Sequence, residues 1–143
     1  MDQRGSGKVI GVIDTSALVR LFIPDGPLPD GFEQFLAGTE RGLNVAIAPE
    51  LLLVEVPNVL NKKKKSGELT HEESENLLSD ILSVPIRIFS HRPLLLKAYE
   101  MAGEHGLTVY DTMYLALAVQ QGAVVYSVDT ELVKVATRLN LTI

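Results

Sequence analysis

The sequence predicts an α/β protein of three layers, with helices on both faces of a mainly parallel central sheet. Short apolar segments of strand length alternate along the chain with segments of helical periodicity. Two of the apolar segments, VIGVI and AVVY, each lead within three residues to an aspartate and then to a predicted helix. The 143 residues, 46% hydrophobic and 22% charged, have the length and composition of one globular domain. We expect a single domain over residues 1–143, with residues 1–7 as a flexible N-terminal tail.

The individual elements follow from hydrophobic periodicity and from residues typical of helix ends. Val and Ile in KVIGVIDTS, residues 8–16, suit a strand that is covered on both faces. Pro49 favours the first turn of a long helix that ends in four lysines, and Pro57 should bend that helix. Thr70 and Glu73 have the spacing of a capping box, which indicates a helix start. Further strands are predicted at 44–48, 84–89, 123–128 and, on the edge, 141–143, and helices at 17–23, 32–39, 49–66, 70–83, 92–105, 110–121 and 130–139.

Composition excludes several kinds of site. The chain has no cysteine, which excludes disulfides and thiolate metal sites. It has no apolar run of membrane-spanning length and no signal-peptide core at its start, so we expect a cytoplasmic protein without membrane contact. A net charge of -5 is not typical of a general nucleic-acid binder, although an acidic site that recruits divalent cations also lowers the net charge.

Two aspartates follow predicted strands. Asp14 ends the first strand, and Asp129 comes two residues after Ser127 at the end of the strand AVVYSV. In open parallel sheets the ligand site lies beyond the carboxyl ends of the strands, so both acids are candidates for chemistry. The alternative for each is a structural one, because aspartate, threonine and serine at such positions also cap the following helix.

Two further acids lie on predicted helices. Glu55 shares a helical face with apolar side chains, where an ionised acid is costly unless it is paired or bound to a metal. The alternative is that Glu55 reaches water at the edge of this face. Asp111 stands in the first turn of a helix that is almost wholly apolar from Met113 to Val119, so that it is expected near the core. Its alternative is a surface acid that complements the helix dipole.

Parallel topology brings strand ends and the following helix starts to one edge of the sheet. Carboxylates collected there repel one another unless cations lie between them, and all-oxygen ligands favour Mg²⁺ or Mn²⁺. Such ions lower the pKa of a bound water and neutralise charge on a phosphate. The four acids therefore indicate a metal-dependent phosphodiesterase.

Four segments resemble the acidic motifs of the PIN domain, and of VapC-type toxin ribonucleases in particular: VIDTSALV, LLVEVPNVLNK, LTVYDTMYLALA and VVYSVDTEL. The match is in order and covers nearly the whole chain. It implies a PIN-like, Rossmann-like fold in which Thr15 and Ser127 supply supporting hydroxyls. The metal-binding and catalytic acids that it implies are Asp14, Glu55, Asp111 and Asp129. Val54 departs from the family pattern, where many relatives have serine, and so does Pro57, close behind the glutamate.

The resemblance implies a Mg²⁺- or Mn²⁺-dependent endoribonuclease, the toxin of a type II toxin-antitoxin system. Its partners would be RNA, an antitoxin protein and a second copy in a homodimer, for which the apolar face of Leu18, Leu21 and Phe22 is one candidate surface. The alternative function is a PIN-like binding or scaffold module with a structural cation. The lysines Lys62, Lys63, Lys64 and Lys65 are candidates for RNA contact, or else a solvated helix end that suits the dipole.

Overall fold

The computed structural model describes residues 8–143, and the expected tail at residues 1–7 lies outside the described residues. Its central sheet has four strands in the order β3-β2-β1-β4, and every neighbouring pair is parallel. In the middle of the sheet, Val12 on β1 lies opposite Ile47 on β2 and Val125 on β4. This confirms the predicted parallel α/β class. The strands are β1 (Val9–Ile13), β2 (Asn44–Pro49), β3 (Arg87–Phe89) and β4 (Val124–Tyr126).

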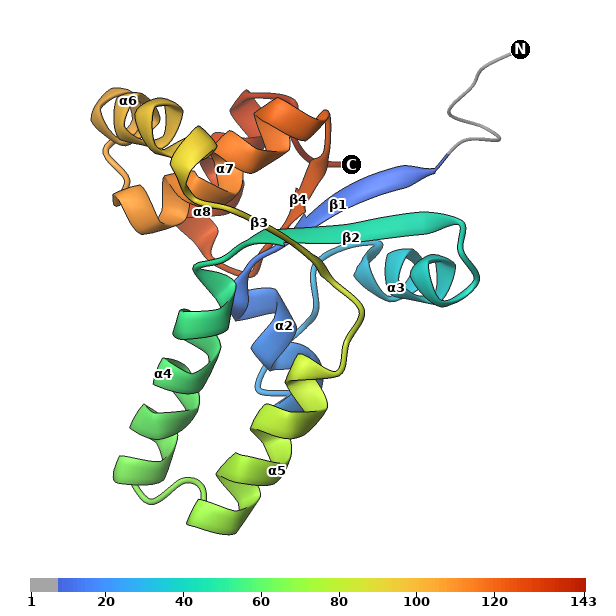
Figure 1. The fold of residues 1–143 in the computed structure, drawn as a ribbon, viewed down its shortest axis with the longest axis vertical. Helices are drawn as coiled ribbons and strands as arrows, with labels where there is room; N and C mark the ends of the chain where they lie inside the picture. Colours follow the sequence, from blue (N-terminus) through green and yellow to red (C-terminus); the bar gives the residue numbers. More distant parts are fainter. Residues whose placement is uncertain (1–7) are drawn as a thin grey trace.

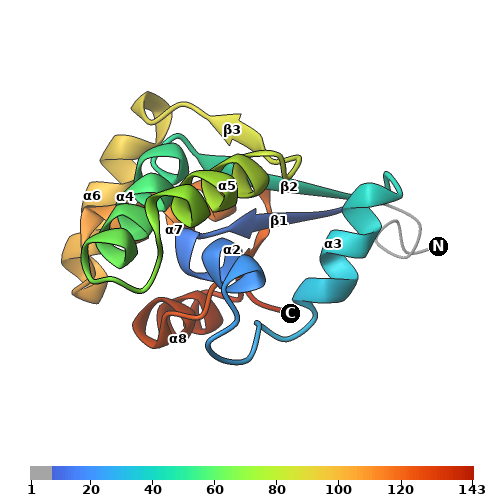
Figure 2. The ribbon, with the colours of Figure 1, turned by 90° about the horizontal axis from the view of Figure 1, so that it is seen from below.

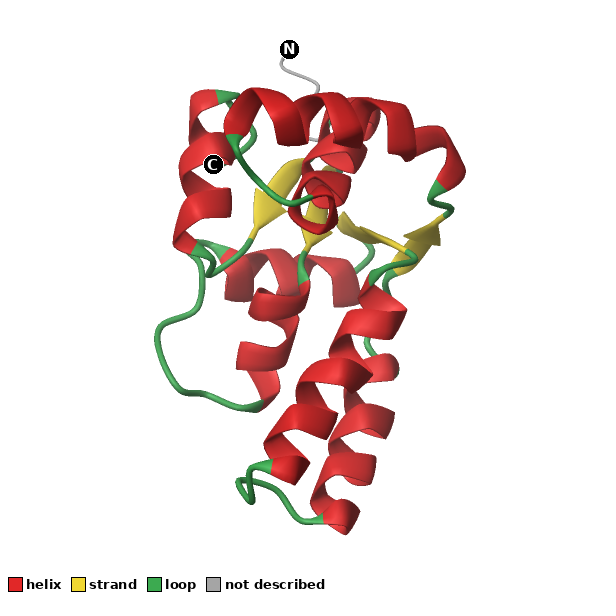
Figure 3. Ribbon diagram, turned by 90° about the vertical axis from the view of Figure 1, so that its left-hand side faces the viewer, coloured by secondary structure: helices red, strands yellow, loops and turns green. Residues whose placement is uncertain are grey.

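Helices cover both faces of the sheet (Figure 1). On one face α7 packs against β1, β2 and β4, and α6 packs on α7; on the other face α3 packs against β2. The pair α4 and α5 extends away from the sheet as two adjacent helices, visible at the bottom of Figure 3. Figure 2 shows α2 beside this pair. The helices are α2 (Thr15–Phe22), α3 (Phe32–Glu40), α4 (Leu52–Lys65), α5 (His71–Leu82), the 3-10 turn η1 (Arg92–Leu94), α6 (Leu95–His105), α7 (Val109–Gln121) and α8 (Thr130–Arg138).

The strand β1 is held between two packed layers, as its apolar sequence predicts. Val12 and Ile13 are fully buried. A Cβ atom added at Gly11 would lie 2.6 Å from Phe35 Cζ and 2.8 Å from Tyr126 Cε2, so only glycine leaves room for these rings. Because β1 is fixed by this packing, the position of the residue that follows it, Asp14, is fixed as well.

Most predicted elements are present, and the capping box is confirmed. Thr70 Oγ1 accepts from the N–H of Glu73 at 3.0 Å, and Glu73 Oε1 accepts from the N–H of Thr70 at 2.9 Å. The helix α7 is buried on nearly all sides, as predicted, with every residue from Thr112 to Ala118 buried. None of the helices in residues 8–143 is long and apolar enough to cross a bilayer.

Several predicted boundaries were wrong, and one predicted strand is absent from the described residues. The strand predicted at 123–128 is β4, which ends at Tyr126. Pro49 is the last residue of β2, opposite Phe89, and does not lie in the helix. A proline fits a strand end because it has no N–H for which the ladder must supply a partner. The helix starts at Leu52. The strand β3 begins at Arg87, three residues later than predicted. Residues 141–143 are not a strand: they run beside β4 with one hydrogen bond, from the N–H of Val125 to the carbonyl of Leu141 at 2.7 Å.

Candidate active site

The four predicted acids line one pocket at the carboxyl edge of the sheet. The pocket has a volume of about 370 Å³. It lies between α2 and α4, and the ends of β1 and β4 and the start of α7 also contribute to it. The four predicted acids that line it are Asp14, Glu55, Asp111 and Asp129, and a fifth acid, Asp25, lines it as well. The structure thus brings together side chains that are up to 115 positions apart in the sequence.

Asp14 is the most buried of these acids, with 5% of its surface exposed. Its Oδ1 accepts from Ser16 Oγ at 2.7 Å and from the N–H of Ala17 at 2.9 Å, and its Oδ2 accepts from Ser127 Oγ at 2.5 Å. Asp14 is therefore the N-cap of α2 as well as a pocket residue. Burial raises its pKa from 3.8 to about 6, against the lowering effect of these hydrogen bonds, and the nearby charge of Asp129 raises it further.

Glu55 is held in place by two hydroxyl groups. Thr15 Oγ1 donates to its Oε1 at 2.8 Å and the Tyr114 hydroxyl donates to the same oxygen at 2.5 Å. Burial, together with the adjacent Glu55 carboxylate, raises the pKa of Tyr114, so the phenol remains a donor. No hydrogen bond from the described residues reaches Oε2 of Glu55, and this oxygen remains available to a cation. Glu55 is partly buried. It therefore lies between the two interpretations of the sequence, in which the carboxylate is either on a buried face or reaches water at the edge of that face.

Asp111 and Asp129 form the more open side of the pocket. Asp111 lies in the first turn of α7, whose N-cap is Thr108. Burial is the largest cause that raises its pKa, followed by the charges of Asp129 and Glu55. Asp129 caps α8, since its Oδ1 accepts from the N–H groups of Glu131 and Leu132 at 3.0 and 3.2 Å. Its capping role, expected as an alternative, coexists with its place in the pocket.

Two serines connect the ends of β1 and β4. Ser127 Oγ donates to Asp14 and accepts from the N–H of Asp129 at 3.0 Å. Ser16 Oγ donates to Asp14 and accepts from the N–H of Val128 at 3.1 Å. Both strand ends are therefore fixed relative to one another before any ligand binds.

The donor atoms suit a hard divalent cation. All four acids offer oxygen. Burial raises the pKa of Asp14 and of Asp111, and the nearby charge of Asp129 raises both further; a positive charge among the acids would offset both effects. Within residues 8–143, no three acidic, histidine or cysteine side chains lie close enough to enclose an ion by themselves. Magnesium is commonly held by one or two carboxylates together with water and substrate phosphate, which this arrangement allows.

The sequence did not single out three residues that the structure places at the site: Tyr114, Ser16 and Arg20. Tyr114 lies three residues after Asp111 and hence on the same side of α7, so helical spacing could have identified it. Of the four candidate lysines only Lys63 lines the pocket. Val54, which departs from the family pattern, is 64% exposed and does not line it.

The chain is similar to known proteins over most of its length. The family model of the PIN domain matches residues 11–138. Ribonuclease VapC3 of Pyrobaculum aerophilum is 31% identical over 126 residues, which are 85% of this chain and 90% of that protein.

Solved structures show the same fold. PAE2754 of Pyrobaculum aerophilum superposes with a TM-score of 0.66 at 24% identity, over 92% of this chain and 90% of the other. VapC20 of Mycobacterium tuberculosis, a toxin that cleaves the sarcin-ricin loop, superposes with a TM-score of 0.62 at 16% identity, over 87% and 94% of the two chains. The sequence match, the parallel sheet and the carboxylates at its edge agree: the chain belongs to the PIN domain family.

Proposed function

We propose that this protein is a divalent-metal-dependent endoribonuclease and the toxin of a type II toxin-antitoxin system. The observation that carries the proposal is the convergence of four carboxylates on one pocket. The similarity of this chain to a VapC ribonuclease, over 85% of its length, supports RNA as the substrate class. A scaffold module gains nothing from burying carboxylates next to one another, which raises the pKa of Asp14 and of Asp111 mainly through desolvation and further through the charge of Asp129.

The cation would be Mg²⁺ or Mn²⁺, held by oxygens that the protein leaves unsatisfied. Three hydrogen bonds occupy three of the roughly four acceptor positions of the Asp14 carboxylate, so one remains on Oδ2. Glu55 offers Oε2, and Asp111 and Asp129 lie on the open side of the same pocket. When bound, such an ion lowers the pKa of a bound water and neutralises charge on a phosphate.

The chain's own residues supply positioning. Thr15 and Tyr114 fix the orientation of Glu55, and Ser16 and Ser127 fix that of Asp14, so the carboxylates need little rearrangement when substrate binds. None of the three histidines, all of which lie within the described residues 8–143, lines the pocket. A nuclease that uses the ribose 2′-hydroxyl requires a general base and acid and leaves a cyclic phosphate, whereas direct attack by water leaves a 5′-phosphate and a 3′-hydroxyl. We therefore expect the cleaved RNA to carry 5′-phosphate and 3′-hydroxyl ends.

The test is cleavage of a mixed RNA pool in Mn²⁺ by wild type and by Asp111→Asn, purified identically. Wild type should cut, EDTA should stop it, and the variant should lose about a hundredfold or more of the rate, the scale for removing one transition-state-stabilising group. Cleavage by wild type that persists in EDTA, or that yields cyclic-phosphate ends, would overturn the proposal. Equal rates for the two proteins would indicate a contaminating nuclease.

The protein partners follow from the proposed family role. We propose a cytoplasmic antitoxin that occupies the acidic pocket, and a homodimer. The face first considered for the dimer is unsuitable, because Leu18 is buried and Leu21 and Phe22 pack against the core. The helix α6 is a better surface, since Leu96 and Tyr99 are 73% and 72% exposed. Light scattering at high micromolar concentration should give the mass of a dimer, and Leu96→Asp should give a monomer.

A further inference from the structure

Two cationic side chains line the pocket together with the four clustered acids and Asp25: Arg20 on α2 and Lys63 on α4. On α4, Lys63 lies eight residues after Glu55, on the same helical face and about 12 Å further along the axis. On α2, Arg20 lies four residues after Ser16, again on the same face. Both cations therefore extend the acidic pocket outward, away from the sheet, between the two helices.

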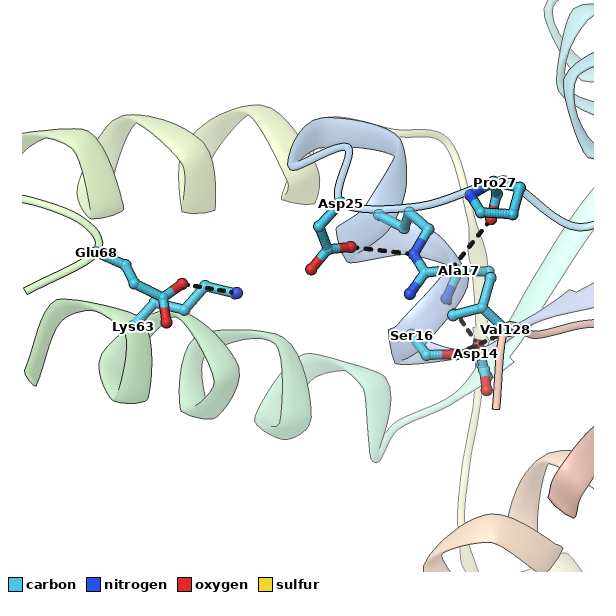
Figure 4. A network of polar contacts seen from close by, with 9 residues as sticks. Asp14, Ser16, Ala17, Asp25, Pro27, Lys63, Glu68 and Val128 are labelled. Atoms are coloured by element: carbon cyan, nitrogen blue, oxygen red, sulfur yellow. Dashed lines mark hydrogen bonds and ion pairs between the residues drawn. The ribbon is translucent and has the colours of Figure 1, made fainter. Parts of the chain in front are cut away.

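Each cation is paired with an acid outside the carboxylate cluster. Arg20 Nε lies 3.2 Å from Asp25 Oδ1, and its Nη1 donates to the carbonyl of Pro27 at 3.1 Å. Lys63 Nζ lies 3.2 Å from Glu68 Oε2. Figure 4 shows Lys63 with Glu68 at the left of the view and Asp25 with Pro27 at the right.

The exposure of these side chains is unequal within each pair. Arg20 and Lys63 are 26% and 21% exposed, whereas Asp25 and Glu68 are 61% and 60% exposed. Ion pairs with such exposed partners contribute little to stability, so exchanging the acid for another anion costs little. The cations are thus mostly covered by the protein, whereas their acidic partners are mostly exposed to solvent.

The chemistry of the pocket requires cations for an RNA substrate. Four carboxylates repel a polyanion, and a cation bound among them attracts only the phosphate next to it. The phosphates on the adjacent nucleotides still need positive partners. Arginine and lysine at the outer part of the pocket are suited to this, and they recognise the backbone without reading the bases.

We propose that Arg20 and Lys63 bind backbone phosphates next to the scissile one, and that each exchanges its carboxylate partner, Asp25 or Glu68, for a phosphate when RNA binds. This inference rests on the proposed ribonuclease function and deepens it. It also assigns different roles within the lysine run: Lys63 contacts the RNA at the active site, whereas Lys62, Lys64 and Lys65, which do not line the pocket, contribute less.

The experiment measures binding of a fluorescein-labelled single-stranded RNA by anisotropy, in Mg²⁺, at several salt concentrations. All variants are made in an Asp111→Asn background so that bound RNA is not cut. Each phosphate contact on a single strand contributes about 0.7 to the slope of log K against log salt concentration. Arg20→Gln and Lys63→Gln should each lower that slope by about this amount and weaken binding several-fold, and the double variant should lose about twice as much.

Two kinds of variant separate phosphate binding from a purely structural role. Arg20→Lys keeps the charge but removes the bonds that hold the loop at Asp25 and Pro27, so it should retain most of the salt slope. Asp25→Asn and Glu68→Gln release the cations and should tighten RNA binding, which a structural role would not predict. Matched controls are Arg41→Gln and Lys8→Gln, which remove the same charges from exposed positions that do not line the pocket.

An unchanged salt slope in the double variant would overturn the inference while leaving the ribonuclease proposal intact, provided that wild type cleaves RNA. Weaker binding by Asp25→Asn, as severe as that by Arg20→Gln, would also overturn it, because both residues would then serve only to hold the loop. A wild-type protein that neither binds nor cuts RNA would overturn the proposed function, and this inference with it.

Discussion

The chain leaves β1 and β4 in the same way, through an aspartate that caps a helix, but the two aspartates have different surroundings. Asp14 is 5% exposed and uses both carboxylate oxygens in hydrogen bonds, two of them from serine hydroxyls. Asp129 is half-buried and uses only Oδ1, for two backbone N–H groups. Ser127 joins the two, because it donates to Asp14 and accepts from the N–H of Asp129.

The same local pattern, an aspartate that caps a helix after a strand, can therefore place a carboxylate either deep in the site or on its more open side. Asp14 is desolvated, held from several sides and close to other carboxylates, so its charge is costly in the metal-free protein. Asp129 performs ordinary capping and contributes its charge to the pocket from a more exposed position. We therefore expect substitutions at the β1 end to change activity and stability more than the same substitutions at the β4 end.

The largest effect should come from Asp14→Asn. Asparagine retains the cap and a hydrogen bond to Ser127 but has no charge for a cation, so RNA cleavage should fall by at least about a hundredfold. Melting measurements should show a second effect. Mn²⁺ at a hundred times its Kd should stabilise wild type by about 2.7 kcal/mol, and the variant should lose most of this gain. A variant that melts like wild type at every Mn²⁺ concentration would place the cation away from Asp14.

The next effect concerns pH. In the folded protein the pKa of Asp14 is about 6, above the ordinary 3.8, so the folded state binds the extra proton between these values. In EDTA the free energy of unfolding should therefore fall as pH rises from about 4 to about 6, by about 3 kcal/mol at 1.36 kcal/mol per pKa unit, and Asp111 adds a change of the same sign.

The variant Asp14→Asn isolates this contribution of one carboxyl group. In EDTA it should be more stable than wild type at pH 8 and differ little from it at pH 4, in urea unfolding followed by circular dichroism. A wild-type protein that gains stability from pH 4 to pH 6 relative to the variant would show that the Asp14 charge is favourable in the fold, contrary to the burial argument.

The site could be predicted from the sequence because the topology of a parallel sheet determines where its acids meet. Parallel strands with helical crossovers place Asp14 and Asp129 at one edge, whatever the details of packing. The orientation of Glu55 could not be predicted, because it depends on how α4 packs beside α2 and α5. Nor could the bond from Tyr114 to Glu55, which joins residues 59 positions apart. Residues 141–143 have the apolar composition of a strand, but Asn140 takes a left-handed φ of 58° and only one bond to β4 follows.

Tyr114→Phe should have an intermediate effect. It removes one of the two donors to Glu55 Oε1 and leaves the packing of α7 intact, so Glu55 becomes less well oriented while Thr15 still holds it. A hydrogen bond to a charged group contributes about 1.5–3 kcal/mol, and with one donor left we expect the lower end, about a tenfold loss of kcat with little change in KM. Thr15→Val should act in the same direction. Full activity in Tyr114→Phe would show that Thr15 alone is enough to position the carboxylate.

The smallest effect should come from Asp129→Asn, for which Asp129→Ala is the matched partner. Asparagine caps a helix about as well as aspartate, so the melting temperature should change little, whereas alanine should lower the free energy of unfolding by about 1 kcal/mol. Both variants lose the same charge from the pocket and should lose the same activity, less than tenfold if Asp129 only adds to the field that the other three acids create. Activity that is lost in the alanine variant alone would mean that Asp129 acts through the start of α8. Activity lost equally in both, and by as much as in Asp14→Asn, would mean that the buried carboxylate after β1 and the half-buried carboxylate after β4 contribute equally to the site.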